Sequence, residues 1–233
     1  MNYNLASSFQ IKKTIFSNST WSNDVADLLL NKICSTTLDT GCCNVMLTGG
    51  RAAKEIYASL SVDDRFRNLN NVNFYFGDER CVPEFDLQSN YKMVKEELFP
   101  NGLPGNCSIF PMKIISNDLD ASADEYDKTL PHKIDVLILS MGEDGHIASL
   151  FPHSPVLYES SKRVCSVIGH KPPYERLTIT PPVLNSADNI YILAFGDEKL
   201  KLFEKLEDNV GDFYSIPARL VIHGNWFLFE DIN

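Results

Sequence analysis

A histidine that stands among glycines is the residue of this chain best suited to chemistry. His146 ends the segment Gly142-Glu143-Asp144-Gly145-His146, in which Asp144 could orient the imidazole. Histidine moves protons readily near neutral pH, and glycines let the backbone approach a ligand closely. A lone loop histidine is more often a surface or structural residue. The prediction of a general base at His146 therefore depends on what the other loops contribute.

A glycine pair marks a second loop of interest. Thr48-Gly49-Gly50-Arg51 follows the apolar run Asn44–Leu47 and precedes a helix that we expect to reach about Leu60. Free N–H groups and the dipole at a helix N-terminus both favour an anion such as phosphate. The spacing matches neither a P-loop nor a dinucleotide-binding fingerprint. An ordinary tight turn is the alternative.

Two more loops carry charged groups after apolar runs. Asp78 and Arg80 follow Val72–Phe76, and Lys199 follows Ile190–Phe195. The guanidinium fork of Arg80 suits a phosphate or an oxyanion. The alternatives are a surface ion pair for Arg80 and a solvated helix residue for Lys199.

The elements that must position these loops alternate between strands and helices. Ile134–Leu139 is a nearly continuous apolar run, which is typical of a strand buried on both faces of a parallel sheet. We predict an α/β fold, a single Rossmann-like three-layer domain over residues 1–233, with a mostly parallel sheet and helices on both faces. In such sheets ligands bind at the carboxyl ends of the strands, so the four loops should converge there.

The remaining elements are expected from local patterns. Arg176–Thr180 alternates in polarity and predicts a half-exposed strand in which Arg176 and Thr178 share a face. Pro181-Pro182 should end that strand. A last strand pair is expected near Leu220–Ile222 and Trp226–Phe229.

Composition limits the partners. The net charge of -10 argues against nucleic acid or an anionic membrane as the main partner. No apolar run reaches the roughly 18 residues of a membrane helix, and the N-terminus lacks a signal-peptide pattern. The six cysteines form no C-x-x-C pair, which indicates free thiols in a reducing cytoplasm. The oligomeric state is not indicated, and a monomer is compatible with the sequence.

Taken together, the four loops describe an enzyme acting on a phosphorylated small molecule, without a metal or a redox cofactor. The segments G-D-E-R-C-V-P, G-E-D-G-H-I-A-S-L-F-P, R-L-T-I-T and F-G-D-E-K resemble those of the 6-phosphogluconolactonase family. Their order and spacing match from about Lys12 to Phe229. The resemblance implies hydrolysis of 6-phospho-D-glucono-1,5-lactone to 6-phosphogluconate in the oxidative pentose phosphate pathway.

The resemblance also implies roles for residues. His146 would activate water, Asp144 would orient the imidazole or the water, and Arg80 or glycine-loop N–H groups would stabilise the oxyanion. The residues expected to bind substrate or phosphate are Thr48, Gly49, Gly50, Arg51, Asp78, Gly145, Arg176 and Lys199. One departure is Arg51-Ala52-Ala53, where the family usually carries Ser or Thr.

Three alternatives remain. A glucosamine-6-phosphate deaminase/isomerase shares the D-G-H-I-A segment, but Ser149-Leu150-Phe151-Pro152 and the G-D-E-R form favour the lactonase. A non-catalytic sugar-phosphate sensor need not keep Asp144 and His146 together. A cysteine hydrolase is the poorest option, because no cysteine has an evident histidine partner.

Overall fold

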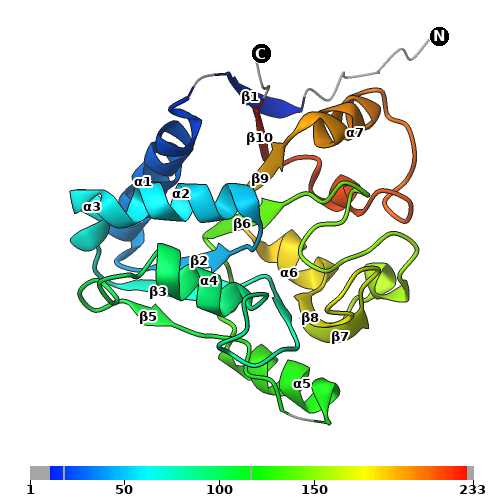
Figure 1. Cartoon of the computed structure of the whole chain (residues 1–233), viewed down its shortest axis with the longest axis horizontal. Coiled ribbons are helices and arrows are strands. Elements are labelled where there is room, and N and C mark those ends of the chain that lie inside the picture. The colour runs from blue at the N-terminus through cyan, green and yellow to red at the C-terminus, as the bar shows by residue number, and fades with distance from the viewer. Residues whose placement is uncertain (1–10, 18, 116, 230–233) are drawn as a thin grey trace, which may run out of the picture.

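The computed structural model describes residues 11–17, 19–115 and 117–229. Within them a seven-stranded parallel sheet has the order β1-β10-β9-β6-β2-β3-β5 (Figure 1). Its strands are β1 Lys12–Phe16, β2 Cys43–Leu47, β3 Val72–Phe76, β5 Ser108–Ile109, β6 Val136–Ser140, β9 Asn189–Phe195 and β10 Asn225–Phe229. The helices are α1 Trp21–Thr40, α2 Arg51–Val62, α3 Asp64–Arg67, α4 Asn90–Glu97, α5 Leu119–Thr129, α6 Pro181–Ser186 and α7 Asp197–Glu207, with short 3-10 helices η1 Pro155–Tyr158 and η2 Pro217–Val221.

The predicted α/β fold is confirmed. The central strand β6 is buried along Val136–Leu139, as expected of a strand covered on both faces. In Figure 1, α1 and α2 lie mostly to the left of β6, β9 and β10, and α6 and α7 lie to the right of these strands. The helices therefore cover both faces.

The strand order reverses between β2 and β6. From β2 the chain moves outward to β3, and from β6 it moves the opposite way to β9 and β10. A reversal of this kind opens a crevice at the carboxyl ends of the two central strands. The glycine pair follows β2 and the histidine loop follows β6, so both lie at that crevice.

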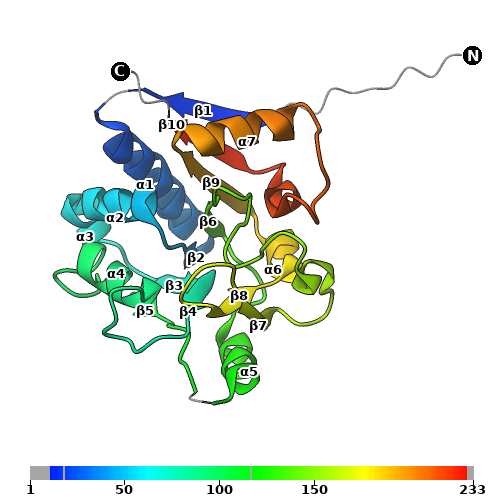
Figure 2. The same cartoon turned by 45° about the vertical axis from the view of Figure 1, so that its right-hand side comes forward.

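A second sheet was not predicted. β4 Asp78–Arg80, β8 Glu175–Ile179 and β7 Val164–Ile168 pair antiparallel, next to α5 (Figure 2). The prediction that Arg176–Thr180 is half exposed is wrong, because Arg176 through Thr180 are buried. Pairing with β4 and β7 covers both edges of β8, and α5 packs against it.

One boundary prediction also fails. Leu220–Ile222 is not a strand, since Pro217–Val221 forms η2. A short apolar run cannot be distinguished from a buried helical turn by its pattern alone. The prediction that Pro181-Pro182 ends the strand is confirmed, since β8 stops at Ile179. The same two prolines begin α6, because a proline at the first helical position loses no intrahelical hydrogen bond.

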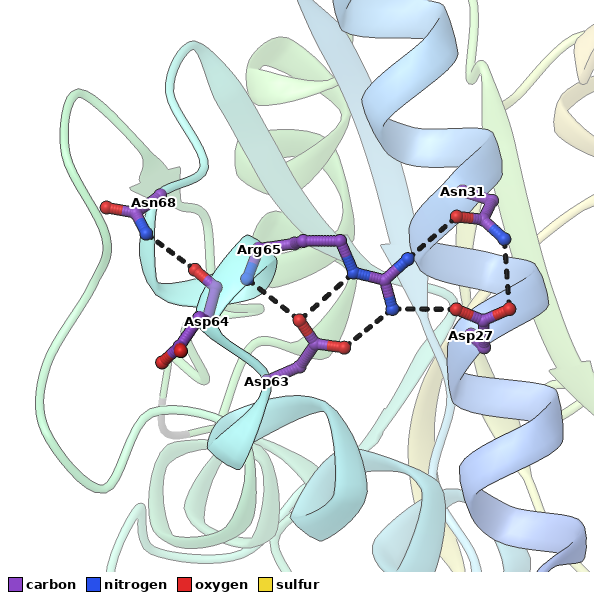
Figure 3. Close-up of polar contacts among 6 residues, drawn as sticks. All are labelled: Asp27, Asn31, Asp63, Asp64, Arg65 and Asn68. Atoms are coloured by element: carbon purple, nitrogen blue, oxygen red, sulfur yellow. Dashed lines mark hydrogen bonds and ion pairs between the residues drawn. The ribbon is translucent and has the colours of Figure 1, made fainter.

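A polar cluster joins α1 to the start of α3 (Figure 3). The Arg65 guanidinium donates to Asp63 at 3.1 and 2.6 Å, to Asp27 at 2.7 Å and to Asn31 at 2.8 Å. Hydrogen bonding to Arg65 lowers the pKa of Asp63, whose side chain also caps α3. The cluster stabilises the packing of α3 against α1.

Membrane insertion finds no support in the described ranges. Every helix there is too short or too polar to cross a bilayer.

Candidate active site

The histidine loop, residues 141–147, is a tight turn closed by its own backbone. Gly142 N–H donates to the His146 carbonyl at 2.8 Å, and Gly145 N–H donates to the Gly142 carbonyl at 3.0 Å. The Ala218 N–H, at the start of η2, donates to the Gly145 carbonyl at 2.9 Å. Because these bonds hold both ends of the turn, the backbone that carries the imidazole is fixed.

Both glycines are required by their surroundings. A Cβ at Gly142 would lie 2.1 Å from His146 Cε1, so the imidazole rests directly on this residue's backbone. Gly145 has φ +83, and a Cβ there would lie 2.8 Å from Ile216 Cγ2. The loop thus has no room for a side chain at either position.

The imidazole is oriented by the neighbouring carboxylate. Asp144 Oδ1 lies 2.5 Å from His146 Nδ1 and accepts from the His146 backbone N–H at 3.2 Å. Burial raises the pKa of Asp144, but the hydrogen bonds and the charge of His146 outweigh it and lower that pKa to about 2. An ionised carboxylate only accepts hydrogen bonds, so Nδ1 carries a proton and Nε2 is left as the base.

A buried polar network supports the loop from below. Asp78, 6% exposed, accepts from Ser149 Oγ at 2.7 Å and from Asn90 Nδ2 at 3.2 Å. Thr178 Oγ1 accepts from Ser149 N–H at 3.1 Å. The structure therefore places Asp78 beneath the histidine loop as a support, and not on the cavity wall.

The candidate phosphate-binding cavity lies between two helix N-termini. It has a volume of about 690 Å³ and is lined by the N-cap glycines of both helices, Gly50 and Gly196, and by Arg51 of α2 and Lys199 of α7. Four carboxylates also line it: Glu55, Glu143, Asp197 and Glu198. The first N–H groups of a helix lack intrahelical partners and attract anions. A cavity of about 740 Å³ around Glu79 and Tyr91 includes none of the predicted site residues.

Lys199 is the cation most affected by this cavity. Burial lowers its pKa, the carboxylate of Glu143 opposes that effect, and the charge of Arg51 adds to it. A bound dianion strongly stabilises the charged form of a desolvated ammonium that has a second cation nearby. Thr48 is different: its hydroxyl accepts from Ser140 N–H at 3.2 Å, and its backbone N–H and carbonyl both bond to the Tyr57 hydroxyl.

Gly49 and Gly50 line the same turn. A Cβ on Gly49 would lie 2.1 Å from Asn90 Oδ1, and Gly50 has φ +104. The turn thus tolerates only glycine at both positions, and it brings the backbone to the start of α2.

Two arginines face each other across the small sheet. Arg80 of β4 is the register partner of Arg176 of β8. Arg176 is 8% exposed, and burial followed by the charge of Arg80 lowers its pKa. Arg80 donates through Nη1 to the Gln88 carbonyl at 2.9 Å, and its buried Nε has no partner in the described residues. The charges of Asp78 and Glu79 partly oppose this effect on Arg176.

Several supporting residues were not predicted as site residues. The sequence indicates Gly142 only as a residue that lets the backbone approach a ligand, and Asn90 only as part of a helix cap with Ser89. It indicates no site role for Ser149 or Phe151. Phe151 is 5% exposed, and its ring centroid lies 4.9 Å from that of His146. Only the family segment that contains Ser149 and Phe151 could have indicated them, because their contacts come from distant strands.

Metal ligation has no candidate. Within residues 11–17, 19–115 and 117–229, no group of three or more His, Cys, Asp or Glu side chains could hold a metal ion.

Comparison with known proteins gives a consistent result. A family model described as glucosamine-6-phosphate isomerases/6-phosphogluconolactonase matches residues 17–228. The chain is 32% identical over 206 residues to 6-phosphogluconolactonase 3 of Saccharomyces cerevisiae, covering 80% of this chain and 82% of the yeast protein. It is 34% identical over 170 residues to 6-phosphogluconolactonase of Mycobacterium tuberculosis, covering 66% and 68%. A 6-phosphogluconolactonase structure from Shewanella baltica superimposes with a TM-score of 0.85 at 21% identity, covering 96% and 99%.

Proposed function

The chain belongs to the family of glucosamine-6-phosphate isomerases and 6-phosphogluconolactonases, and from this membership we propose that it hydrolyses 6-phospho-D-glucono-1,5-lactone to 6-phosphogluconate. The observation that carries the proposal is the Asp144–His146 pair, which stands beside a cavity with two cations and two helix N-termini. This is a step of the oxidative pentose phosphate pathway. A cytoplasmic location and a single domain over residues 1–233 belong to the same proposal.

In this proposal the phosphate lies in the cavity between α2 and α7. Lys199, Arg51 and the N–H groups after Gly50 bind it. The phosphate dianion offsets the repulsion between the two cations. Because burial destabilises the charged form of Lys199, the dianion stabilises that residue in particular. The backbone and Arg51 then take the place of the Ser or Thr hydroxyls that the sequence lacks here.

The reaction needs one proton transfer in each direction. Water attacks C1 while its proton passes to Nε2 of His146, and the carbonyl oxygen becomes an oxyanion. Collapse of this intermediate breaks the bond between C1 and the ring oxygen, which receives the proton back from His146. Asp144 stabilises the imidazolium between the two transfers. General-base help of this kind is worth about 10² to 10⁴ in rate.

Arg80 is the proposed donor to the oxyanion, with glycine-loop N–H groups as the other source. Its unpartnered Nε supports this role, and a well-placed donor contributes roughly 3 kcal/mol to the transition state. Arg176 is proposed as a supporting residue. Its Nε donates to the Pro173 carbonyl at 2.8 Å, which commits it to the chain segment before β8.

The test is lactone hydrolysis measured above the spontaneous rate. The phospholactone is generated freshly by glucose-6-phosphate dehydrogenase, and product is followed through 6-phosphogluconate dehydrogenase. His146→Ala should remove most of the acceleration, whereas His132→Ala, an exposed histidine outside the site, should keep it. Full activity in His146→Ala would reject the mechanism. Ammonia release from glucosamine 6-phosphate, without lactonase activity, would assign the chain to the isomerase branch.

A further inference from the structure

Asp144 lies between two imidazoles and not beside one. Its Oδ1 is 2.5 Å from His146 Nδ1, and its Oδ2 is 3.9 Å from Nδ1 of His170. His170 stands far from the histidine loop in sequence. One carboxylate therefore faces two titratable rings.

Hydrogen bonds within and around the 169–174 loop fix the position of His170. Gly169 N–H donates to the Tyr174 carbonyl at 2.6 Å, which closes the loop. Arg176 donates from Nε to the Pro173 carbonyl at 2.8 Å and from Nη2 to the Lys171 carbonyl at 3.4 Å. These bonds fix the loop backbone on both sides of His170.

Phe151 provides the surface on which the 169–174 loop rests. A Cβ on Gly169 would lie 3.1 Å from Phe151 Cζ, so the loop packs closely against this ring. The His170 and His146 ring centroids lie 5.1 and 4.9 Å from that of Phe151. The two imidazoles thus share an aromatic neighbour as well as a carboxylate.

The charges around His170 leave Asp144 as its main partner. The titratable and charged groups that face it are Asp144 and Glu143 of the histidine loop, Lys171 of its own loop, His153 in the same groove, and Arg176 across Phe151. Lys171 and Glu143 pair with each other at 3.8 Å and are largely exposed, so their effects on His170 oppose each other. The His170 side chain is 55% exposed.

We propose that His170 is a positioning residue that holds the second oxygen of Asp144 and couples its own protonation to that of His146. When His170 is protonated, its charge attracts the carboxylate and repels a second proton on His146. His146 then remains an unprotonated base to lower pH. The consequence for catalysis rests on the proposed function, whereas the coupling itself does not.

The test is a proton NMR titration of the histidine rings in the whole chain. The chain has five histidines, so each signal can be assigned by substitution. His170→Asn removes the titrating charge, and His170→Lys makes a positive charge permanent. His153→Asn is the matched control, because it removes a histidine of the same groove at a backbone φ of +63, which asparagine tolerates.

The expected result is a fixed order of the His146 titration midpoints among the variants. His146 should titrate at the highest pH in His170→Asn, lower in the unchanged chain and lowest in His170→Lys. Each step should be on the order of half a pH unit, the size of the interaction between unit charges several Å apart near solvent. His153→Asn should leave the midpoint unchanged. A purely structural role would shift the two His170 variants in the same direction or not at all, and either result would overturn the proposal.

Lactonase kinetics separate this inference from the proposed function. If the chain is a lactonase, the acid side of its kcat/KM profile should move in the same order as the midpoints. An ordered NMR shift in a chain without lactonase activity would reject the proposed function and leave the coupling established.

Discussion

Replacing Gly142 with alanine should disable the base without unfolding the protein. The new Cβ would lie 2.1 Å from Cε1 and 2.2 Å from Nδ1 of His146. Carbon atoms in contact are about 3.5 Å apart, so the ring must move by roughly 1.4 Å. Gly142 has no positive φ, and its backbone therefore accepts alanine without strain.

The magnitude follows from that displacement. A shift of about 1 Å in a catalytic group costs on the order of 10² in rate, and complete loss of a general base costs up to about 10⁴. We expect kcat/KM of Gly142→Ala to fall between these limits. The His146 side chain is 30% exposed and can swing toward solvent, so the free energy of unfolding should fall by only about 1 kcal/mol.

Gly77→Ala is the matched control. Gly77 is buried and precedes Asp78, but its added Cβ would meet nothing nearer than the Leu47 carbonyl oxygen at 3.6 Å. Its activity should stay within about twofold. The coupled lactonase assay gives the rates, and thermal unfolding gives the stabilities of both variants. Wild-type kcat/KM in Gly142→Ala would refute the placement of His146 on the glycine backbone.

The remaining predictions concern charge. Lys199→Met should raise KM roughly 10- to 100-fold through lost phosphate binding and change kcat little, as measured by steady-state kinetics. A loss in kcat alone would contradict the phosphate role of Lys199. Asp144→Asn should lower stability at pH 7 by about 1 kcal/mol, because exposure screens the pair. Since the pKa of Asp144 is depressed to about 2, this contribution is present above pH of about 4 and is lost as pH falls toward 2, so urea unfolding at several pH values should show the gap closing. Arg65→Ala should lower Tm by about 2 to 4 °C. Arg67 makes one ion pair, with an exposed partner at 3.3 Å, so Arg67→Ala should lower Tm less. Equal shifts in Tm would contradict a stabilising role for the cluster in Figure 3.

Much of the parallel sheet could be predicted because its strands carry their own signal. Val72–Phe76 was predicted with its observed bounds, and the central run Ile134–Leu139 was placed within two residues of β6. Buried parallel strands are apolar along their length, so the pattern appears without knowledge of the partner strands. The convergence of the loops after β2, β6 and β9 then followed from strand direction alone.

The small antiparallel sheet could not be predicted, because it depends on distant pairing. Asp78–Arg80 looks like a charged loop until its partner Arg176–Thr178 is known. The same pairing buries Arg176, which the local alternation placed at half exposure. Long-range contacts decide burial here, and no local pattern encodes them.

The supporting residues of the site were hidden for the same reason. Asp78 and Arg176 were predicted to bind substrate because their side chains suit phosphate chemistry. In the structure Asp78 accepts from Ser149 and Arg176 donates to the 169–174 loop, contacts that the sequence did not indicate. The roles of both residues in substrate binding stay predictions. Side-chain chemistry indicates what a residue can bind, whereas only packing shows what already occupies it.

The hydrogen bond from Ala218 to Gly145 has a consequence for the order of assembly during synthesis. The histidine loop leaves the ribosome well before η2, which braces it through Ala218 and Ile216. A nascent chain that ends before η2 carries His146 and Asp144 but lacks the segment that holds Gly145 in place. Because a domain generally folds as a unit, the base should take its working position only after η2 has been made.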